Sequence, residues 1–290
     1  MKPTISIIIP IYNAAQHLRQ CLQSLLEQGL ESYEVLLVND ASHDNSRAIC
    51  SEWCQEHPQF RLLGHETNRG AGEARNTGLR HTTGNYVTFV DADDFLAEGT
   101  LGFVLQEIGE ADVAEYPIAM NHLSNHPTLW KPENKEIDFA RWMQTDGYAH
   151  SYAWNKVYRR QLWEGILFPA DKMVEDMFTV PFIMRKARRI KGIQQGLYYY
   201  CTREGSLSRT SDPAHLRDYV DALNALLEMP EGSSNTSLYI QALNAQITYR
   251  RAGGNATPVK ARRIPWAYIM QRGLTAKQRV KALWFKLTYR

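Results

Sequence analysis

The chain has 290 residues, of which 44% are hydrophobic and 11% aromatic, and this composition indicates a globular core and excludes an intrinsically disordered protein. No run of about 18 apolar residues is present to span a bilayer, and no basic segment followed by an apolar run marks a signal peptide. The net charge of +2 hides an asymmetry, because eleven Lys or Arg residues lie between Arg250 and Arg290 and no Asp or Glu follows Glu231. The four cysteines form no CxxC pair, which favours reduced thiols in a cytosolic protein.

The first hundred residues alternate between short apolar runs and segments with apolar residues at helical spacing. The runs are typical of buried parallel strands. We expect strands at about 5–9, 34–38, 60–64 and 86–90, and helices at about 14–28, 44–57 and 71–81. This alternation predicts an α/β protein with a doubly wound, mostly parallel sheet flanked by helices, in which ligands bind beyond the carboxyl ends of the strands.

The pattern is less regular after residue 94. We expect a strand within 111–119, a loop over 122–136, a helix that begins at about 154, a helix from 174 to about 187, a strand at 198–200, and helices at about 213–228 and 237–252.

The strand at 86–90 runs directly into three carboxylates, Asp91, Asp93 and Asp94. Asp91 and Asp93 are two positions apart, so on a continuing strand they face the same side. Two close carboxylates repel each other, and Mg²⁺ is typically held by one or two carboxylates together with phosphate oxygens. The stretch therefore predicts a metal–diphosphate site; the alternative is an acidic turn in which Asp93 or Asp94 caps a following helix.

Four blocks of sequence follow one another at the ends of the expected strands. They are Ile7-Ile8-Ile9-Pro10-Ile11-Tyr12-Asn13, Val38-Asn39-Asp40-Ala41-Ser42-His43-Asp44-Asn45-Ser46, Asn68-Arg69-Gly70-Ala71-Gly72-Glu73-Ala74-Arg75-Asn76-Thr77-Gly78 and Phe89-Val90-Asp91-Ala92-Asp93-Asp94. Together they resemble glycosyltransferase family 2, the inverting nucleotide-sugar transferases of the GT-A fold. Asn39 stands where that family commonly has Asp, and Ala41 where it commonly has Gly. The missing carboxylate at Asn39 puts a second contact with the nucleotide in doubt.

The resemblance implies a site for a UDP-sugar and a divalent metal, Mn or Mg. The implied nucleotide-sugar contacts are Pro10, Tyr12, Asn13, Asp40, Asn68, Arg75, Asp91 and Ala92, and the implied metal ligands are Asp93 and Asp91. Asp40 would bind the base, and Arg75 would donate to the diphosphate. The alternatives are a turn-capping Asp40 and an Arg75 in a surface salt bridge.

The second half resembles the same family more loosely. Trp154-Asn155-Lys156-Val157-Tyr158-Arg159-Arg160 is similar to a W-N-K-x-Y-x-R block of bacterial polysaccharide and lipopolysaccharide transferases. Glu175-Asp176 matches a later block in which the Asp is the expected catalytic base, so Asp176 is the predicted base and Glu175 the second choice. Lys156 and Arg203 are further predicted contacts with the nucleotide sugar. The alternatives are acidic residues in the first turn of a helix and a solvated loop Arg203.

The basic tail has an apolar helical face. It comprises Ala276, Val280, Leu283, Trp284 and Leu287. A basic amphipathic helix with Trp suits an anionic membrane surface; the alternative is a helix that packs on the catalytic domain. Nucleic acid is not an expected partner, because no recognition motif accompanies the basic residues.

We therefore predict a GT-A catalytic domain over 1–210 and a helical C-terminal region with the basic tail over 211–290. Within the domain, 1–110 would bind the nucleotide sugar and 111–210 the acceptor. The predicted enzyme moves a hexose or uronic acid from a UDP-sugar to a glycan, such as lipopolysaccharide core or another lipid-linked surface polysaccharide. It would be cytoplasmic and peripheral on the inner face of a bacterial membrane; the sequence indicates no oligomeric state. The alternatives are a non-catalytic nucleotide-sugar-binding scaffold and a nucleotidyltransferase. The latter needs a Gly-rich loop with Arg or Lys after the first strand, where Pro10-Ile11-Tyr12-Asn13 stands instead.

Overall fold

The computed structural model of the chain describes residues 3–120, 128–201, 212–233 and 235–254, and residues 275–277, 279–280 and 283–284 of the tail. The chain forms two compact units. The first unit comprises Met1–Phe139, Ser151–Asp171 and Thr179–Glu204, and the second comprises Ala140–His150, Lys172–Phe178 and Gly205–Arg290. The second unit thus contains two segments from the middle of the chain in addition to the C-terminal region.

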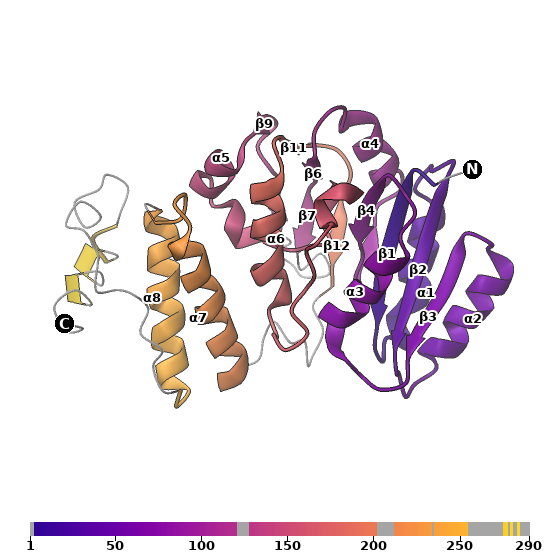
Figure 1. Cartoon of the computed structure of the whole chain (residues 1–290), viewed down its shortest axis with the longest axis horizontal. Coiled ribbons are helices and arrows are strands. Elements are labelled where there is room, and N and C mark those ends of the chain that lie inside the picture. The colour runs from indigo at the N-terminus through magenta and orange to yellow at the C-terminus, as the bar shows by residue number, and fades with distance from the viewer. Residues whose placement is uncertain are drawn as a thin grey trace. The chain divides into compact units, whose positions relative to one another are not determined.

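An eight-stranded sheet forms the centre of the first unit (Figure 1). Its strands, in spatial order, are β3 (Phe60–His65), β2 (Tyr33–Asp40), β1 (Ile5–Ile11), β4 (Tyr86–Phe89), β10 (Lys156–Arg159), β6 (Val113–Glu115), β11 (Ile190–Gly192) and β9 (Glu136–Ile137). The first four strands pair in parallel, and β10 is antiparallel to both of its neighbours. This arrangement confirms the predicted α/β fold with a mostly parallel, doubly wound sheet.

The helices between the first four strands also follow the predicted pattern. They are α1 (Ala15–Leu26), α2 (Ser46–Glu56) and α3 (Gly70–His81), and α4 (Thr100–Glu107) follows the acidic motif. The apolar residues of α1 at helical spacing, Leu18, Leu22 and Leu25, are fully buried. Helix α3 approaches β1 closely, since a Cβ on Gly78 would lie 2.4 Å from Cγ2 of Ile8. The glycine at this position is therefore required by the packing of helix on sheet.

A second, four-stranded sheet in the same unit is built from short strands. Its order is β5 (Phe95–Leu96), β12 (Tyr198–Tyr200), β7 (Ile118–Met120) and β8 (Thr128–Trp130). The single strand expected within 111–119 is wrong in one respect, because it is divided at Pro117 into β6 and β7, which belong to different sheets. Proline has no N–H to donate to a continuing ladder. The loop expected over 122–136 is also wrong in part, since it contains β8 and the start of β9; residues 121–127 lie outside the described part.

The helix expected to begin at about 154 is wrong. Lys156–Arg159 forms strand β10, which is followed by a 3-10 helix, η2 (Arg160–Trp163). Val157 and Tyr158 are fully buried between β4 and β6. Burial between two strands suits a β-branched and an aromatic residue better than a helix does, so tertiary context decides this segment.

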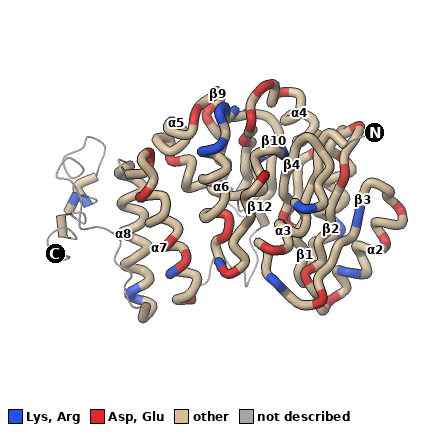
Figure 2. The backbone as a smooth tube through the Cα atoms, viewed as in Figure 1, with Lys and Arg blue, Asp and Glu red and all other residues tan. Residues whose placement is uncertain are grey.

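The second unit is helical in the described residues. It contains η1 (Gly147–His150), most of α5 (Phe139–Gln144), the start of α6 (Glu175–Lys186), α7 (Pro213–Glu228) and α8 (Thr236–Arg251), and the last three confirm the predicted helices. Asp212 caps α7 by accepting from Ala214 N at 2.9 Å. The charged residues of α8 are Arg250 and Arg251 in its last turn (Figure 2).

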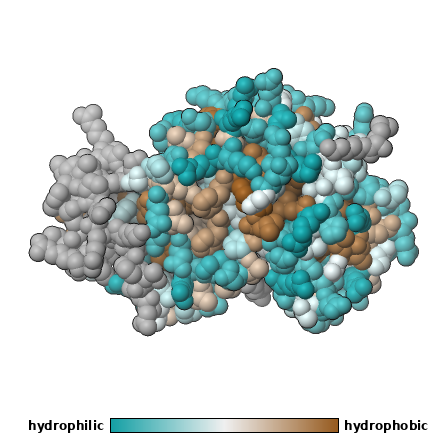
Figure 3. Space-filling model, in the orientation of Figure 1, coloured by the Kyte–Doolittle hydropathy of each residue, from teal (hydrophilic) through white to brown (hydrophobic). Residues whose placement is uncertain are grey.

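The surface of the described part is mixed in character. Figure 3 shows hydrophilic side chains over much of the face in view, with patches of apolar side chains between them. In the tail, Val280 and Trp284 are exposed, and Leu287 of the predicted apolar face lies outside the described residues. None of the helices described here has the length and apolar character needed to cross a membrane.

Candidate functional site

Two loops at the carboxyl ends of β1 and β2 are joined by side-chain hydrogen bonds. Asn13 N donates to Ser42 Oγ at 3.1 Å, and His43 N donates to Asn13 Oδ1 at 2.8 Å. Asn13 and Ala41 have φ values of 50° and 55°, a region that non-glycine residues enter at some cost. Strained backbone that persists is held by its surroundings and is frequent at functional sites.

The same two loops are joined a second time at the start of α1. Ala14 N donates to Ser46 Oγ at 2.9 Å, and Ala15 N donates to Asp44 Oδ2 at 3.0 Å. Although partial burial opposes the effect, hydrogen bonds from Ser46 and Ala15 lower the pKa of Asp44. The loops thus form one connected edge at the end of the sheet.

Tyr12 presents an open aromatic ring on this edge. Tyr12 as a whole is 43% exposed, and its ring lies edge-on to that of His43, with 6.4 Å between the ring centroids. Pro10, another predicted contact with the nucleotide sugar, is half-buried near the end of β1. An exposed aromatic face beside fixed main-chain groups is suited to contact a planar nucleobase.

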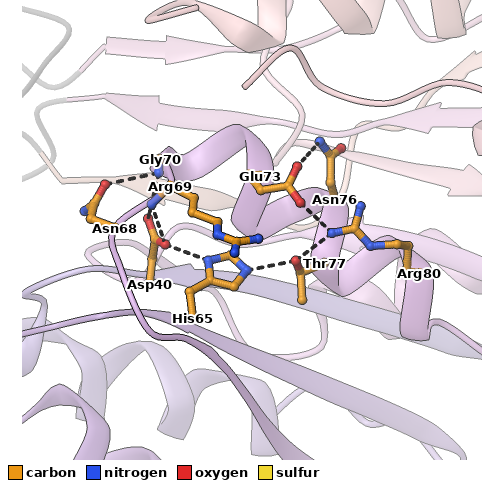
Figure 4. A network of polar contacts seen from close by, with 9 residues as sticks. All are labelled: Asp40, His65, Asn68, Arg69, Gly70, Glu73, Asn76, Thr77 and Arg80. Atoms are coloured by element: carbon orange, nitrogen blue, oxygen red, sulfur yellow. Dashed lines mark hydrogen bonds and ion pairs between the residues drawn. The ribbon is translucent and has the colours of Figure 1, made fainter. Parts of the chain in front are cut away.

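Asp40 is held in a network that the sequence did not reveal (Figure 4). Its carboxylate accepts from Arg69 N at 2.9 Å and from Gly70 N at 2.8 Å, which are the first main-chain donors of α3. Its Oδ1 also lies 2.7 Å from Nδ1 of His65. Because a carboxylate only accepts, Nδ1 carries the hydrogen. Asp40 therefore caps α3 from a distant strand, and its side chain is only 3% exposed.

The network continues from His65 along α3. His65 Nε2 lies 2.9 Å from Thr77 Oγ1, and Arg80 donates to the same hydroxyl at 2.9 Å. The Thr77 hydroxyl thus links His65 to Arg80 along the same face of α3. Asn68, predicted to contact the nucleotide sugar, is exposed and accepts from Gly70 N at 3.1 Å.

Asn39 differs from Asp40 in having an unused polar atom. It is 2% exposed, and its Oδ1 has no hydrogen-bond partner among the described residues. Leaving a buried acceptor without a donor costs free energy, so a donor from water or from a bound ligand would stabilise this oxygen.

Arg75 does not lie on the surface. Its guanidinium donates to Asp91 Oδ1 at 2.8 Å and lies 5.6 Å from the ring centroid of Phe168. The neighbouring Asn76 is 2% exposed and pairs with the main chain of Phe168, donating to its O and accepting from its N, both at 2.8 Å. The surface salt bridge considered as an alternative for Arg75 is therefore not what is found, since the side chain is buried and faces the acidic motif.

The acidic motif forms a turn at the end of β4. Asp94 N donates to Asp91 O at 3.0 Å, and Asp91 and Asp93 are both half-buried, with Ala92 buried between them. Asp94 is 2% exposed and accepts from Tyr198 Oη at 2.8 Å. Burial raises the pKa of Asp94 well above its ordinary value, and the charges of Asp91 and Asp93 raise it further.

This turn fits a divalent cation that shares its coordination with a substrate. In the described residues, no group of three or more His, Cys, Asp or Glu side chains is arranged to hold a metal ion by itself. Asp91 and Asp93 nevertheless contribute negative charge that raises the pKa of Asp94, and a cation would relieve that repulsion. One or two carboxylates with phosphate oxygens are the usual ligands of Mg²⁺.

Lys156 is placed differently from the other predicted contacts. It is fully buried, and its Nζ lies 3.2 Å from Glu115 Oε1 and donates to Tyr152 O at 2.9 Å. Lys156 and Glu115 are register partners on β10 and β6. These contacts favour a structural role for Lys156 over the predicted contact with the nucleotide sugar.

The predicted base lies in the second unit. Glu175 and Asp176 are the first two residues of α6, and both are half-buried. The chain just before them is fixed by Asp218 of α7, which accepts from Met173 N and from Lys172 Nζ, both at 3.0 Å. Arg203, the remaining predicted contact, lies outside the described residues.

Three residues with clear roles at the site were missed by the sequence analysis. They are His65, Asn76 and Tyr198. Asn76 stood within a recognised block, and His65 directly follows the strand predicted at 60–64, so their positions carried some signal. Tyr198 was visible only as one of three consecutive tyrosines.

Comparison with known proteins places these features in a family. The model of Glycosyl transferase family 2 matches residues 6–168, more than half of the chain. Glycosyltransferase GlyA of Streptococcus pneumoniae is 29% identical over 269 residues, which cover 86% of this chain and 38% of GlyA. The uncharacterized glycosyltransferase EpsJ of Bacillus subtilis is 30% identical over 220 residues, which cover 72% of this chain and 64% of EpsJ. The chain thus spans less than two thirds of either relative.

Solved structures agree in fold. Staphylococcus aureus TarS in complex with UDP-GlcNAc aligns with a TM-score of 0.68 at 22% identity, and the alignment covers 100% of this chain and 92% of that one. At this identity the likeness shows the shared GT-A fold. The match over most of the sheet, with the four sequence blocks at the strand ends, shows that the chain belongs to glycosyl transferase family 2.

Proposed function

We propose that the protein transfers a sugar from a UDP-sugar to a hydroxyl of a glycan, with inversion at the anomeric carbon. The observation that carries the proposal is that the candidate binding residues gather at the carboxyl ends of β1, β2 and β4. The exposed ring of Tyr12, the connected loops behind it and the Arg75–Asp91 pair all lie at this edge of the sheet. Ligands of doubly wound sheets bind at such an edge. The binding of UDP-GlcNAc by TarS supports a UDP-sugar as donor.

The donor would be held from base to diphosphate along this edge. Pro10, Tyr12 and Asn13 contact the base, while Asp40 fixes the start of α3 beside it. Asp91 and Asp93 would hold Mn²⁺ or Mg²⁺, which when bound supplies positive charge to the leaving diphosphate. Arg75 keeps the Asp91 carboxylate in place through its 2.8 Å ion pair. Arg203 is proposed as a further donor to the diphosphate.

Asp176 is the proposed general base. The acceptor hydroxyl must lose a proton as it attacks the anomeric carbon, and a carboxylate within hydrogen-bond reach takes that proton. One displacement from the side opposite the leaving group inverts the configuration. Glu175 is the second candidate on the same helical turn. Lys156 supports the fold of the acceptor half through Glu115.

The proposed acceptor is lipopolysaccharide core or another lipid-linked surface polysaccharide. We further propose that the protein works in the cytoplasm, at the inner face of a bacterial membrane, where the basic tail meets anionic lipid. The exposed Val280 and Trp284 support that role for the tail.

Product analysis tests the proposed reaction. Incubation with UDP-sugars, Mn²⁺ and a lipid-linked glycan should release free UDP and extend the glycan. Release of pyrophosphate would instead indicate a nucleotidyltransferase, and the absence of both products would indicate a binding scaffold. Asp176→Asn should abolish transfer while leaving UDP binding intact, and near wild-type turnover in this variant would overturn the assignment of the base.

A further inference from the structure

The conformation of the acidic turn depends on contacts to the main chain of Asp91. Its carbonyl accepts from Asp94 N at 3.0 Å within the turn, and Sγ of Cys21 approaches the same oxygen at 3.6 Å. Its N–H donates to the hydroxyl of Tyr198 at 3.1 Å. Both the N–H and the carbonyl of Asp91 are thus hydrogen-bonded, and the partner of the N–H is Tyr198, 107 positions further along the chain.

The hydroxyl of Tyr198 makes two hydrogen bonds to the turn, one as acceptor and one as donor. It accepts from Asp91 N and donates its single hydrogen to Asp94 Oδ2 at 2.8 Å. The other oxygen of Asp94 accepts from Cys201 N at 2.7 Å. Both ends of the turn are therefore tied to one atom on another strand.

Tyr198 is itself held rigidly. It is fully buried on β12, with Leu96 of β5 and Ile118 of β7 as register partners. One of its ring contacts is a stack on Trp154, with 4.1 Å between centroids and 24° between planes. The carbonyl of Trp154 accepts from Tyr116 Oη at 2.7 Å. The W-N-K segment thus supports the ring that supports the acidic turn.

We propose that Tyr198 is a positioning residue that presents Asp91 and Asp93 to the cation and diphosphate of the donor. It links the four-stranded sheet, through β12, to the turn that ends β4 in the eight-stranded sheet. Residues that orient metal ligands by hydrogen bonds typically change metal affinity by 10–100-fold when they are replaced. The inference rests on the metal–diphosphate site of the proposed function.

The substitution Tyr198→Phe tests the inference, because it keeps the ring and removes the hydroxyl. The assay is a Mn²⁺ titration of thermal stability at saturating UDP, which reports metal binding without turnover. We expect the Mn²⁺ concentration at half-maximal stabilisation to rise about ten-fold. Tyr148→Phe is the matched control, since it also removes a hydroxyl from a buried tyrosine, but one whose hydroxyl donates to Asp146 within the second unit. Its Mn²⁺ midpoint should stay at the wild-type value, even though its melting temperature without ligand falls.

The outcomes separate this inference from the function on which it rests. A Mn²⁺ midpoint in Tyr198→Phe within two-fold of wild type would overturn the positioning role alone. The absence of any Mn²⁺ response in the wild-type protein would overturn the metal site and this inference together. If Tyr198→Phe does not fold, Trp154→Phe keeps the hydroxyl and reduces the stacking surface behind it. That variant should shift the midpoint in the same direction by a smaller factor, and an unchanged midpoint there would overturn the inference.

Discussion

Replacement of Asp40 by Ala removes an acceptor that three donors share at the start of α3. These donors are Arg69 N, Gly70 N and the Nδ1–H of His65. The carboxylate is only 3% exposed, so water cannot reach all three donors in its place. A buried donor left without an acceptor costs about 1–3 kcal/mol, and the expected loss of stability is therefore roughly 3 kcal/mol or more.

Urea denaturation followed by tryptophan fluorescence measures this loss. Asp44→Ala is the matched control, because Asp44 also accepts two main-chain N–H groups, from Ala15 and Ser46, but is exposed. It should lose about 1 kcal/mol or less. A free energy of unfolding for Asp40→Ala within 1 kcal/mol of wild type would refute the capping role and leave contact with the base as the main role of the carboxylate.

Three further substitutions test the packing and the second unit. Ala41→Gly should raise the free energy of unfolding by about 0.5 kcal/mol. The left-handed backbone costs alanine about 1–2 kcal/mol, and the greater entropy of glycine in the unfolded state offsets about 0.4–1 kcal/mol of that gain. The control Ala48→Gly, on the exposed face of α2, should lower the free energy of unfolding by about 1 kcal/mol, and a change of the same sign in both variants would contradict the reasoning. Gly78→Ala should cost about 1–3 kcal/mol through its clash with Ile8, and wild-type stability would show that Ile8 moves aside freely. Asp218→Ala should lower kcat by about ten-fold or more at an unchanged KM for the donor, because it releases the segment before the proposed base; an unchanged kcat would contradict this.

Local patterns were sufficient for most of the first ninety residues. Strands β1 and β2 are built on apolar runs, and α1 has one apolar face, so no distant partner is needed to recognise them. The short strand β5 was not predicted, because its two residues pair only with β12 from far along the chain. Lys156–Arg159 shows where this fails. Val157 and Tyr158 become a strand only because β4 and β6 lie on either side. The break at Pro117 was also not predicted. Strands β6 and β7 lie on either side of this proline and belong to different sheets.

The positions of candidate site residues were predictable where a residue lies just past the end of a strand. Tyr12, Asp91 and Asp93 are of this kind, and their roles stay predictions. Lys156 has the positive charge expected of a residue that binds a diphosphate. Its ammonium group instead pairs with Glu115 on the adjacent strand, where both side chains are buried. His65 and Tyr198 act through partners that lie 25 and 107 residues away in the chain. Spacing within a motif does not reveal such pairs.

The binding of a nucleotide sugar is the central claim, and thermal stabilisation of the full chain by a panel of nucleotide sugars, with and without Mn²⁺, tests it most directly. A ligand that binds the folded state raises the melting temperature by mass action, equivalent to about 2.7 kcal/mol at one hundred times its Kd. The account predicts a Mn²⁺-dependent rise with one UDP-sugar and a smaller rise with UDP alone. A folded sample that shows no rise with any nucleotide sugar would contradict it.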